Sequence, residues 1–149
     1  ERDFVNSFKE AYKIDEIVIA ESFIRGNEYT LPIIHNKTFP IIEIRSKTEF
    51  YDYEAKYLRN DTEFICPADI SSSLVEIINK TCMESFNSIG CGGWGRVDFI
   101  IDKDEKIFII EINTVPGMTN HSLVPISAKY AGVEFDDLVI MILETSNVQ

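Results

Sequence analysis

The chain has 149 residues, of which 45% are hydrophobic and 26% charged, an ordinary composition for one soluble globular domain. Its formal net charge of −11 argues against a nucleic-acid-binding surface, which should be basic, but not against anionic ligands, because bound Mg²⁺ can reverse the local field. The cysteines lack C-x-x-C spacing, and neither a signal peptide nor a run of 18 apolar residues is present, so we expect a cytoplasmic location and no membrane span. Because the sequence starts at Glu1 inside a helix-like segment, we expect a piece of something longer.

The N-terminal part is expected to form a helix, an antiparallel meander and a long binding loop. Residues 3–13 place apolar side chains at helical spacing, and the runs 16–24, 28–35 and 39–46 are strand-like and separated by turn sequences. Residues 47–66 have little periodicity and many aromatic and charged side chains, which is typical of a lid over a binding site. Disorder is the alternative for this segment, and its aromatic content argues against it.

The strongest helix signal covers residues 71–89. Ser73 and Glu76 can close a capping box at its start, and Gly90 supplies a stop at its end. One apolar stripe follows the helical period and marks Cys82 as a core residue rather than a nucleophile. The stripe consists of Leu74, Ile78, Cys82, Phe86 and Ile89.

The remaining sequence predicts a hairpin, a loop and two short helices. Two β-rich runs flank a charged turn within residues 95–117, and a loop with a Pro-Gly pair covers 114–121. Helices are expected at 122–131 and 135–145, separated by Gly132. This element order predicts an α+β fold, a mainly antiparallel sheet with flanking helices and a long lid loop.

One glycine-rich motif is set aside. Residues 90–95, Gly-Cys-Gly-Gly-Trp-Gly, match the G-x-G-x-x-G pattern of dinucleotide-binding proteins. That pattern must follow a strand and open a helix, whereas this one follows a helix and opens a strand, so we interpret it as a turn. The sequence also lacks the G-x-x-x-x-G-K-[ST] motif of a P-loop.

Polar residues interrupt both strands of the predicted hairpin. A turn centred between Asp104 and Glu105 places Asp98 opposite Glu111. Alternate side chains share a face of a strand, so one face carries the polar cluster and two apolar neighbours. The set is Arg96, Asp98, Glu111 and Asn113, continued by Ile100 and Ile109.

The polar cluster predicts a metal site. Directly opposed Cβ atoms lie about 4.5–5.5 Å apart, and two carboxylates at that distance repel unless a cation or a shared proton lies between them. With the carboxamide of Asn113 they supply oxygen ligands suited to Mg²⁺, and one glutamate can bridge two ions that clamp a phosphoryl group. The alternative is a solvated sheet face on which Arg96 forms salt bridges with Asp98 or Glu111; Asn113 favours the metal site.

Other positions have a functional and a structural interpretation side by side. The amide of Gly117 could stabilise an oxyanion, or the residue is simply part of a Pro-Gly turn. Ser122 can cap the following helix, whose start is also a plausible carboxylate cradle. Lys56 could reach a phosphate or be solvated, and exposed charge is the default for Glu21 and Glu28.

Taken together, the sequence resembles the D-alanine–D-alanine ligase family of ATP-grasp enzymes. The matching segments are 50–57 (Phe-Tyr-Asp-Tyr-Glu-Ala-Lys-Tyr), 66–69 (Cys-Pro-Ala-Asp), 92–98 and, most specifically, 111–125 (Glu-Ile-Asn-Thr-Val-Pro-Gly-Met-Thr-Asn-His-Ser-Leu-Val-Pro). The resemblance runs from about residue 16 to the C-terminus. It implies that residues 1–149 form a C-terminal ATP-grasp domain that binds ATP, Mg²⁺ and substrate, with the N-terminal and central domains absent from this chain.

The resemblance also implies roles for matching positions. For the metal, the implied ligands of two Mg²⁺ ions, or Mn²⁺ in their place, are Asp98, Glu111 and Asn113. For ATP, the implied contacts are Glu21, Phe23 and Ile24 at adenine, Ile100 beneath it, Glu28 at the ribose hydroxyls and Lys56 at the phosphates. For the reaction, Arg96 and Gly117 are implied to stabilise the oxyanion, and Ser122 and Leu123 to bind the carboxylate of the second substrate. Tyr57, beside the lid lysine, is the mark of a dipeptide-forming enzyme.

The implied reaction joins two D-alanines for peptidoglycan precursor synthesis. One D-alanine carboxylate attacks the γ-phosphorus of ATP, and the amine of a second D-alanine attacks the resulting D-alanyl phosphate. One rival is a D-alanyl-D-lactate or D-alanyl-D-serine ligase, and the lid sequence is the feature that discriminates between these ligases. The other is a non-catalytic ATP-grasp module, which the intact polar cluster argues against. The family further implies a homodimer for the full-length protein, and an isolated fragment that is inactive and binds ATP weakly.

Overall fold

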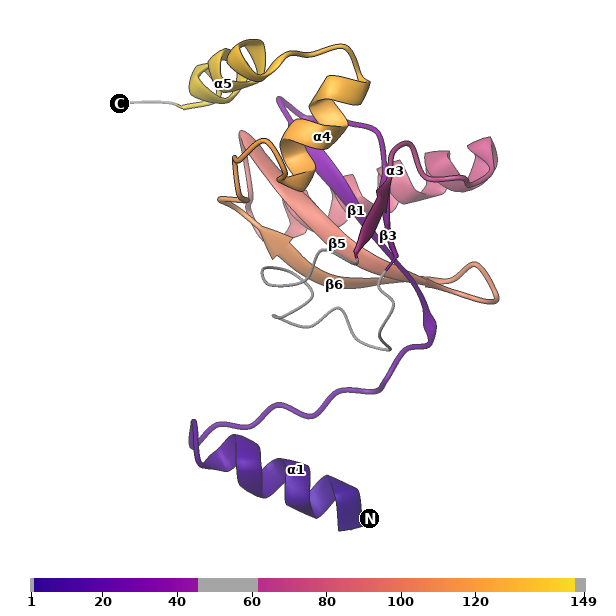
Figure 1. Ribbon diagram of the computed structural model, residues 1–149, viewed down its shortest axis with the longest axis vertical. Coiled ribbons are helices and arrows are strands. Elements are labelled where there is room, and N and C mark those ends of the chain that lie inside the picture. Colours follow the sequence, from indigo (N-terminus) through magenta and orange to yellow (C-terminus); the bar gives the residue numbers. More distant parts are fainter. Residues whose placement is uncertain (1, 46–61, 147–149) are drawn as a thin grey trace.

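A computed structural model describes residues 2–45 and 62–146 of the chain. Its centre is a six-stranded sheet with antiparallel pairing and the order β4-β3-β1-β5-β6, and β2 pairs with β1 (Figure 1). The strands are β1 (Gly26–Ile34), β2 (Lys37–Thr38), β3 (Ile42–Arg45), β4 (Glu63–Ile65), β5 (Trp94–Asp102) and β6 (Ile107–Asn113). The helices are α1 (Arg2–Tyr12), α3 (Ser72–Ser88), α4 (Leu123–Tyr130) and α5 (Phe135–Glu144). The predicted α+β fold with a mainly antiparallel sheet is confirmed.

Strand β1 is the central strand, and its side chains are buried continuously from Tyr29 onward. A strand covered on both faces forms an apolar run of this kind rather than an alternating pattern. Pro32 is unusual in a central strand because it has no N–H to donate. It lies where the ladder to β3, which ends at Thr30, gives way to the ladder to β2, which begins at Ile33, so this gap accommodates the missing donor.

Helix α3 covers one face of the sheet, and its predicted stripe forms the main core. Leu74, Ile78, Cys82 and Phe86 are buried against strand residues that include Val97 and Phe99, which confirms Cys82 as a core residue.

The ends of α3 correct two details of the prediction. The N-cap is Ser71, whose hydroxyl accepts a hydrogen bond from the Leu74 N–H at 3.3 Å, so the capping box expected at Ser73 and Glu76 is wrong. Ile89 is 64% exposed because the helix has already ended there, and Gly90 follows with a left-handed φ of +75°.

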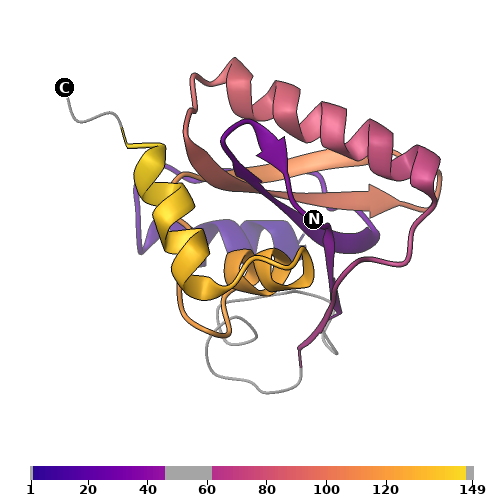
Figure 2. The ribbon, with the colours of Figure 1, turned by 90° about the horizontal axis from the view of Figure 1, so that it is seen from above.

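Helices α4 and α5 lie on the opposite side of the sheet from α3 (Figure 2). Val124 and Ala128 of α4 pack with Leu138 of α5 and with Ile34 of β1. The Ser127 hydroxyl of α4 donates a hydrogen bond to the Pro40 carbonyl at 2.6 Å, which ties the helix to the connection before β3. Both helices fall within one or two residues of their predicted ranges.

The segment before the sheet differs from the prediction. The run 16–24 forms no strand in the described part of the chain, and Ile17 and Ile19 are exposed. It connects α1, which lies apart from the sheet, to β1 (Figure 1). An alternating apolar pattern gives β propensity, but a strand also needs a partner, and within the described residues 16–24 pair with none. The predicted meander is therefore reduced to β1, β2 and β3.

The predicted lid, 47–66, lies mostly outside the described residues, which resume at 62. Its last part forms β4, which pairs with β3 rather than belonging to a loop. None of the helices in the described ranges is long and apolar enough to cross a membrane.

Candidate functional site

Strands β5 and β6 form the predicted hairpin with the predicted register at its polar end. Arg96 is paired with Asn113 and Asp98 with Glu111. The register shifts immediately after Asp98, so that Phe99, and not Ile100, is paired with Ile109. Such a bulge inserts an extra residue and turns the side chains beyond it to the other face.

The bulge corrects one part of the predicted face. Ile109 packs with the core beneath α3, so the prediction that it shares the face of Asp98 is wrong. Ile100 keeps that face because the pairing of β5 with β1 is continuous, and it lies opposite Glu28. Two residues implied to contact the nucleotide, Glu28 and Ile100, are therefore direct neighbours on the face that carries Asp98.

The Asp98 carboxylate is the centre of the polar cluster and is only 4% exposed. Oδ1 accepts hydrogen bonds from Arg96 Nε at 2.8 Å and from the Thr30 hydroxyl at 2.5 Å. Oδ2 accepts from the Arg96 guanidinium at 2.7 Å and from Asn113 Nδ2 at 2.9 Å. A buried carboxylate needs this compensation because desolvation disfavours its charged form.

The Arg96–Asp98 ion pair is the contact that the alternative interpretation anticipated, yet it is not a solvated surface pair. The side chains are only 14% and 6% exposed, and the guanidinium approaches both carboxylate oxygens. A two-point contact of this kind fixes the orientation of both groups, whereas exposed pairs contribute little.

Glu111 and Asn113 complete a cluster of oxygen donors. Asn113 Nδ2 lies 2.9 Å from Asp98 Oδ2 and 3.2 Å from Glu111 Oε1, so the carboxamide stands between the two carboxylates. Glu111 is exposed, which leaves this edge of the cluster open to a ligand. Rotation of the carboxamide by 180° would replace the nitrogen with an oxygen at the same point. The donors then present are all oxygen, which fits Mg²⁺.

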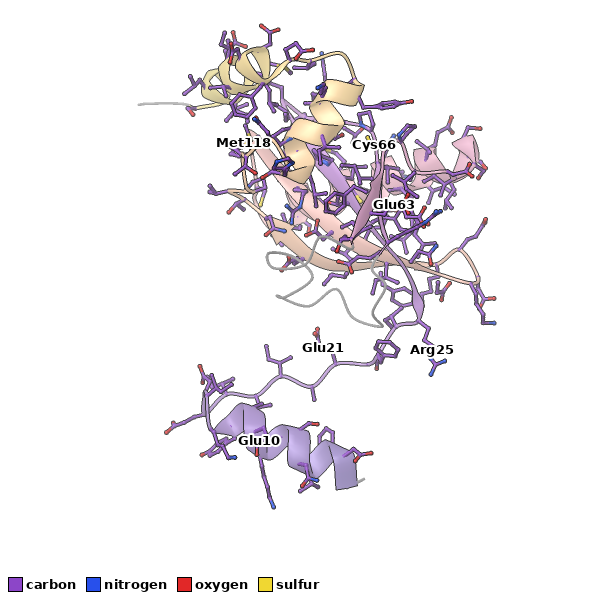
Figure 3. All side chains as sticks on the ribbon, in the orientation of Figure 1. Glu10, Glu21, Arg25, Glu63, Cys66 and Met118 are labelled. Carbon is purple, nitrogen blue, oxygen red and sulfur yellow. The ribbon has the colours of Figure 1, made fainter. Side chains whose placement is uncertain are left out.

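The implied adenine contacts lie on the segment that leads into β1. Phe23 is 58% exposed and Ile24 is partly buried. Glu21 is exposed on the connection between α1 and the sheet (Figure 3). Because this segment is not a strand, the hinge strand implied for it is not formed here, and only Glu28 and Ile100 are held on the sheet itself.

The loop after β6 brings Gly117 and Ser122 together. A Cβ added at Gly117 would lie 3.0 Å from Ser122 Oγ, so the two residues are in close contact. The Ser122 hydroxyl accepts from the Thr119 N–H at 3.0 Å and lies 2.9 Å from the Thr119 hydroxyl. Ser122 is at the N-cap of α4 as predicted, but its side chain makes no capping hydrogen bond, because Thr119 engages it.

Leu123 and the lid residues are the last of the implied positions. The Leu123 side chain is buried with Ile42 and Ile44, so its backbone rather than its side chain would face a substrate. Lys56 and Tyr57 lie outside the described residues.

Thr30 is the residue of the cluster that the sequence reasoning missed. It is opposite Asp98 in the pairing of β1 with β5, and its hydroxyl reaches the carboxylate. The available signal was a polar residue within the apolar run 29–34, two positions after Glu28 and thus on the same face.

Two thiols near the sheet have raised pKa values. Burial, followed by the negative charge of Asp98, raises the pKa of Cys82 to about 12. Burial raises the pKa of Cys66 to about 11. Thiols in such surroundings are protonated at neutral pH and are poor nucleophiles.

Comparison with known proteins places these features in a family. Residues 1–144 match the family model described as D-ala D-ala ligase C-terminus. The chain is 44% identical over 142 residues to D-alanine–D-alanine ligase B of Chromobacterium violaceum, covering 95% of this chain and 47% of that protein. It is 46% identical over 138 residues to the D-alanine–D-alanine ligase of Dechloromonas aromatica, covering 93% and 46% of the two chains.

Solved structures give the same result for the fold. The D-alanine–D-alanine ligase of Bacillus anthracis complexed with ATP superposes with a TM-score of 0.83 at 32% identity, covering 97% of this chain and 46% of that one. The VanG D-Ala:D-Ser ligase of Enterococcus faecalis gives a TM-score of 0.84 at 26% identity, covering 97% and 43%. The chain spans about half the length of the curated relatives it matches. From the match over residues 1–144 and these relatives, the chain belongs to the family of D-alanine–D-alanine ligase C-terminal domains.

Proposed function

We propose that this chain is the ATP- and Mg²⁺-binding C-terminal domain of a D-alanine–D-alanine ligase, an enzyme that joins two D-alanines through D-alanyl phosphate. The observation that carries the proposal is the cluster of Arg96, Asp98, Glu111 and Asn113 on one sheet face, with Glu28 and Ile100 beside it. The names of the relatives and the ATP in the Bacillus anthracis structure support the substrates.

In the first step, the carboxylate of one D-alanine attacks the γ-phosphorus of ATP, and ADP leaves. Asp98, Glu111 and Asn113 hold Mg²⁺, which supplies positive charge to the phosphates when bound. Glu28 accepts hydrogen bonds from the ribose hydroxyls, and Ile100 gives the base an apolar floor. Glu21, Phe23, Ile24 and Lys56 are the remaining proposed nucleotide contacts.

In the second step, the amine of another D-alanine attacks D-alanyl phosphate and phosphate leaves. The Arg96 guanidinium and the Gly117 amide stabilise the negative charge that develops on the carbonyl oxygen. Arg96 is suited to this role because the Asp98 contact fixes its orientation before substrate arrives. Ser122 and Leu123, at the start of α4, receive the carboxylate of the second substrate.

The proposed reaction requires more than this chain. The relatives are about twice as long, and the resemblance to ATP-grasp enzymes implies that the nucleotide is held between two subdomains. We therefore expect the 149-residue chain alone to bind nucleotide weakly and to release no phosphate from ATP and D-alanine. We place the parent enzyme in the cytoplasm as a homodimer.

The metal assignment is tested by titrating the full-length parent enzyme with Mg²⁺–ATP by isothermal calorimetry. Asp98→Asn and Glu111→Gln each remove one negative charge from the cluster and should weaken binding roughly tenfold or more. Asp104→Asn removes the same charge from the exposed turn of the same hairpin and should leave binding within about twofold. Equal binding by all three variants would refute the metal site.

A second candidate is a ligase that takes D-serine as second substrate, because the VanG D-Ala:D-Ser ligase superposes as well as the D-alanine–D-alanine ligases do. Tyr57, beside Lys56, favours formation of a dipeptide over an ester, and we propose D-alanine as the second substrate. Assay of the full-length parent with D-alanine, D-serine and D-lactate as competing acceptors decides between them. Faster D-alanyl-D-serine or ester formation at neutral pH would overturn the preference for D-alanine.

A further inference from the structure

The Thr30 hydroxyl reaches the proposed metal carboxylate from inside the sheet. Its Oγ1 lies 2.5 Å from Asp98 Oδ1 and 3.4 Å from the Val97 carbonyl oxygen. A hydroxyl has one hydrogen to donate, and short contacts of 2.5–2.7 Å are typical of donation to a carboxylate. The proton therefore points to Asp98, and the Val97 contact is secondary.

The surroundings of Thr30 leave the hydroxyl few other partners. The side chain is fully buried, and the residues paired with it on either side are Asp98 of β5 and Ile42 of β3. Ile42 offers only apolar surface on that side. A buried hydroxyl without a partner costs about 1–3 kcal/mol, so the contact with Asp98 also satisfies Thr30 itself.

Thr30 differs from the other hydrogen-bond donors to Asp98 in the element that carries it. Arg96 and Asn113 belong to the hairpin that carries the carboxylate, and both have proposed tasks toward ligands. Thr30 belongs to the central strand β1, which is held by neighbours on both sides. Its β-branched side chain is stiff about χ1, so the hydroxyl has a fixed direction.

We propose that Thr30 is a positioning residue for metal binding: its hydroxyl holds Oδ1 of Asp98 so that the carboxylate keeps the orientation that a divalent cation requires. When a cation draws the Asn113 carboxamide away from the carboxylate, the Thr30 contact remains. Thr30 also stands on β1 two residues after Glu28, so one strand sets both the metal carboxylate and the proposed ribose contact. The inference rests on the proposed role of Asp98 as a metal ligand.

The test measures Mn²⁺ binding to the chain, with the electron paramagnetic resonance signal of the free ion as the readout. Urea unfolding gives the folded fraction of each variant. Thr30→Val removes the hydroxyl and should weaken Mn²⁺ binding roughly tenfold, as loss of a group that orients a ligand does. Thr30→Ser keeps a hydroxyl at this position and should bind Mn²⁺ within about twofold of the wild type. Ser127→Ala loses a buried hydroxyl bonded to Pro40, away from the cluster, and should also bind within about twofold.

The outcomes separate this inference from the proposed function. If Thr30→Val binds Mn²⁺ as the wild type does while Asp98→Asn loses binding, the metal site stands and the positioning role of Thr30 is wrong. If Asp98→Asn binds as the wild type does, or the wild type binds none, the metal assignment fails and the role of Thr30 fails with it. Should Thr30→Val not fold, Thr30→Ala removes the same hydroxyl without adding volume, and the same criterion applies.

Discussion

The two faces of strand β5 have different roles: one packs in the core beneath α3, and the other carries the polar cluster. Val97, Phe99 and Ile101 point toward α3 and are buried in the main core. Arg96 and Asp98, which alternate with them, point to the other face and form the polar cluster. Because neighbouring residues of a strand face opposite ways, changes one residue apart should have different consequences. Changes facing α3 should alter the free energy of unfolding, and changes on the other face should alter ligand binding.

The largest effect is expected from Phe86→Ala in α3. Phe86 is fully buried, and removing its ring should lower the free energy of unfolding by about 3–5 kcal/mol. Ile77→Ala is the matched control on the same helix, because Ile77 is 55% exposed and should change stability by less than about 0.5 kcal/mol. Urea unfolding followed by circular dichroism measures both, and similar losses would contradict the assigned face of α3.

A smaller loss is expected from Gly95→Ala at the start of β5. A Cβ there would lie 2.7 Å from the Phe86 ring and 2.9 Å from the Asn113 carbonyl oxygen, so we expect a loss of about 1–3 kcal/mol from overpacking. Gly92→Ala is the control, because a Cβ at Gly92 meets nothing within 4 Å. If the two variants unfold at the same urea concentration, the close approach of α3 to β5 is wrong.

Alkaline pH should destabilise the α3 face through Cys82. The folded pKa is raised from 9.0 to about 12, so the folded state keeps the thiol proton that the unfolded state loses. This stability is fully present below pH 9 and falls as pH rises toward 12. Between pH 8 and 9.5 the wild type should lose roughly 1 kcal/mol more than Cys82→Ala. Equal pH slopes in unfolding experiments would contradict the prediction.

The smallest change in stability is expected on the other face, from Glu111→Gln. Glu111 is exposed, and a neutral amide can still accept from Asn113 Nδ2, so the free energy of unfolding should change by less than about 0.5 kcal/mol. The same variant should show the roughly tenfold loss of Mg²⁺–ATP affinity described above. A large stability change, without a loss of affinity, would reverse the assignment of the two faces.

Local pattern was sufficient for much of the fold and of the polar cluster. The period of α3 indicated its buried face, and the parity and turn position of the hairpin gave the pairing of Asp98 with Glu111. Both depend on residues close together in sequence, for which geometry follows from the period of the element. The family was likewise predicted from the sequence, most specifically from the run 111–125, although the resemblance was noted only from about residue 16 and the family match covers residues 1–144.

Other features depend on contacts that local pattern does not encode. The amphipathic pattern of α1 resembles that of α3, yet Phe4 and Phe8 are exposed while Phe86 is buried. A pattern gives the face that prefers burial but not the surface that covers it. The strand expected at 16–24 was wrong for the same reason, because no strand of the described residues pairs with it.

The sequence by itself determined which residues alternate along each strand, where the hairpin turns and which family the chain resembles, because each of these is written in neighbouring residues. Tertiary structure alone decided that Thr30 meets Asp98 and that a bulge turns Ile109 into the core. Thr30 and Asp98 are 68 residues apart, and their contact depends on the register of β1 against β5. That register is set by burial on both faces of the sheet at once, a condition that no single segment contains.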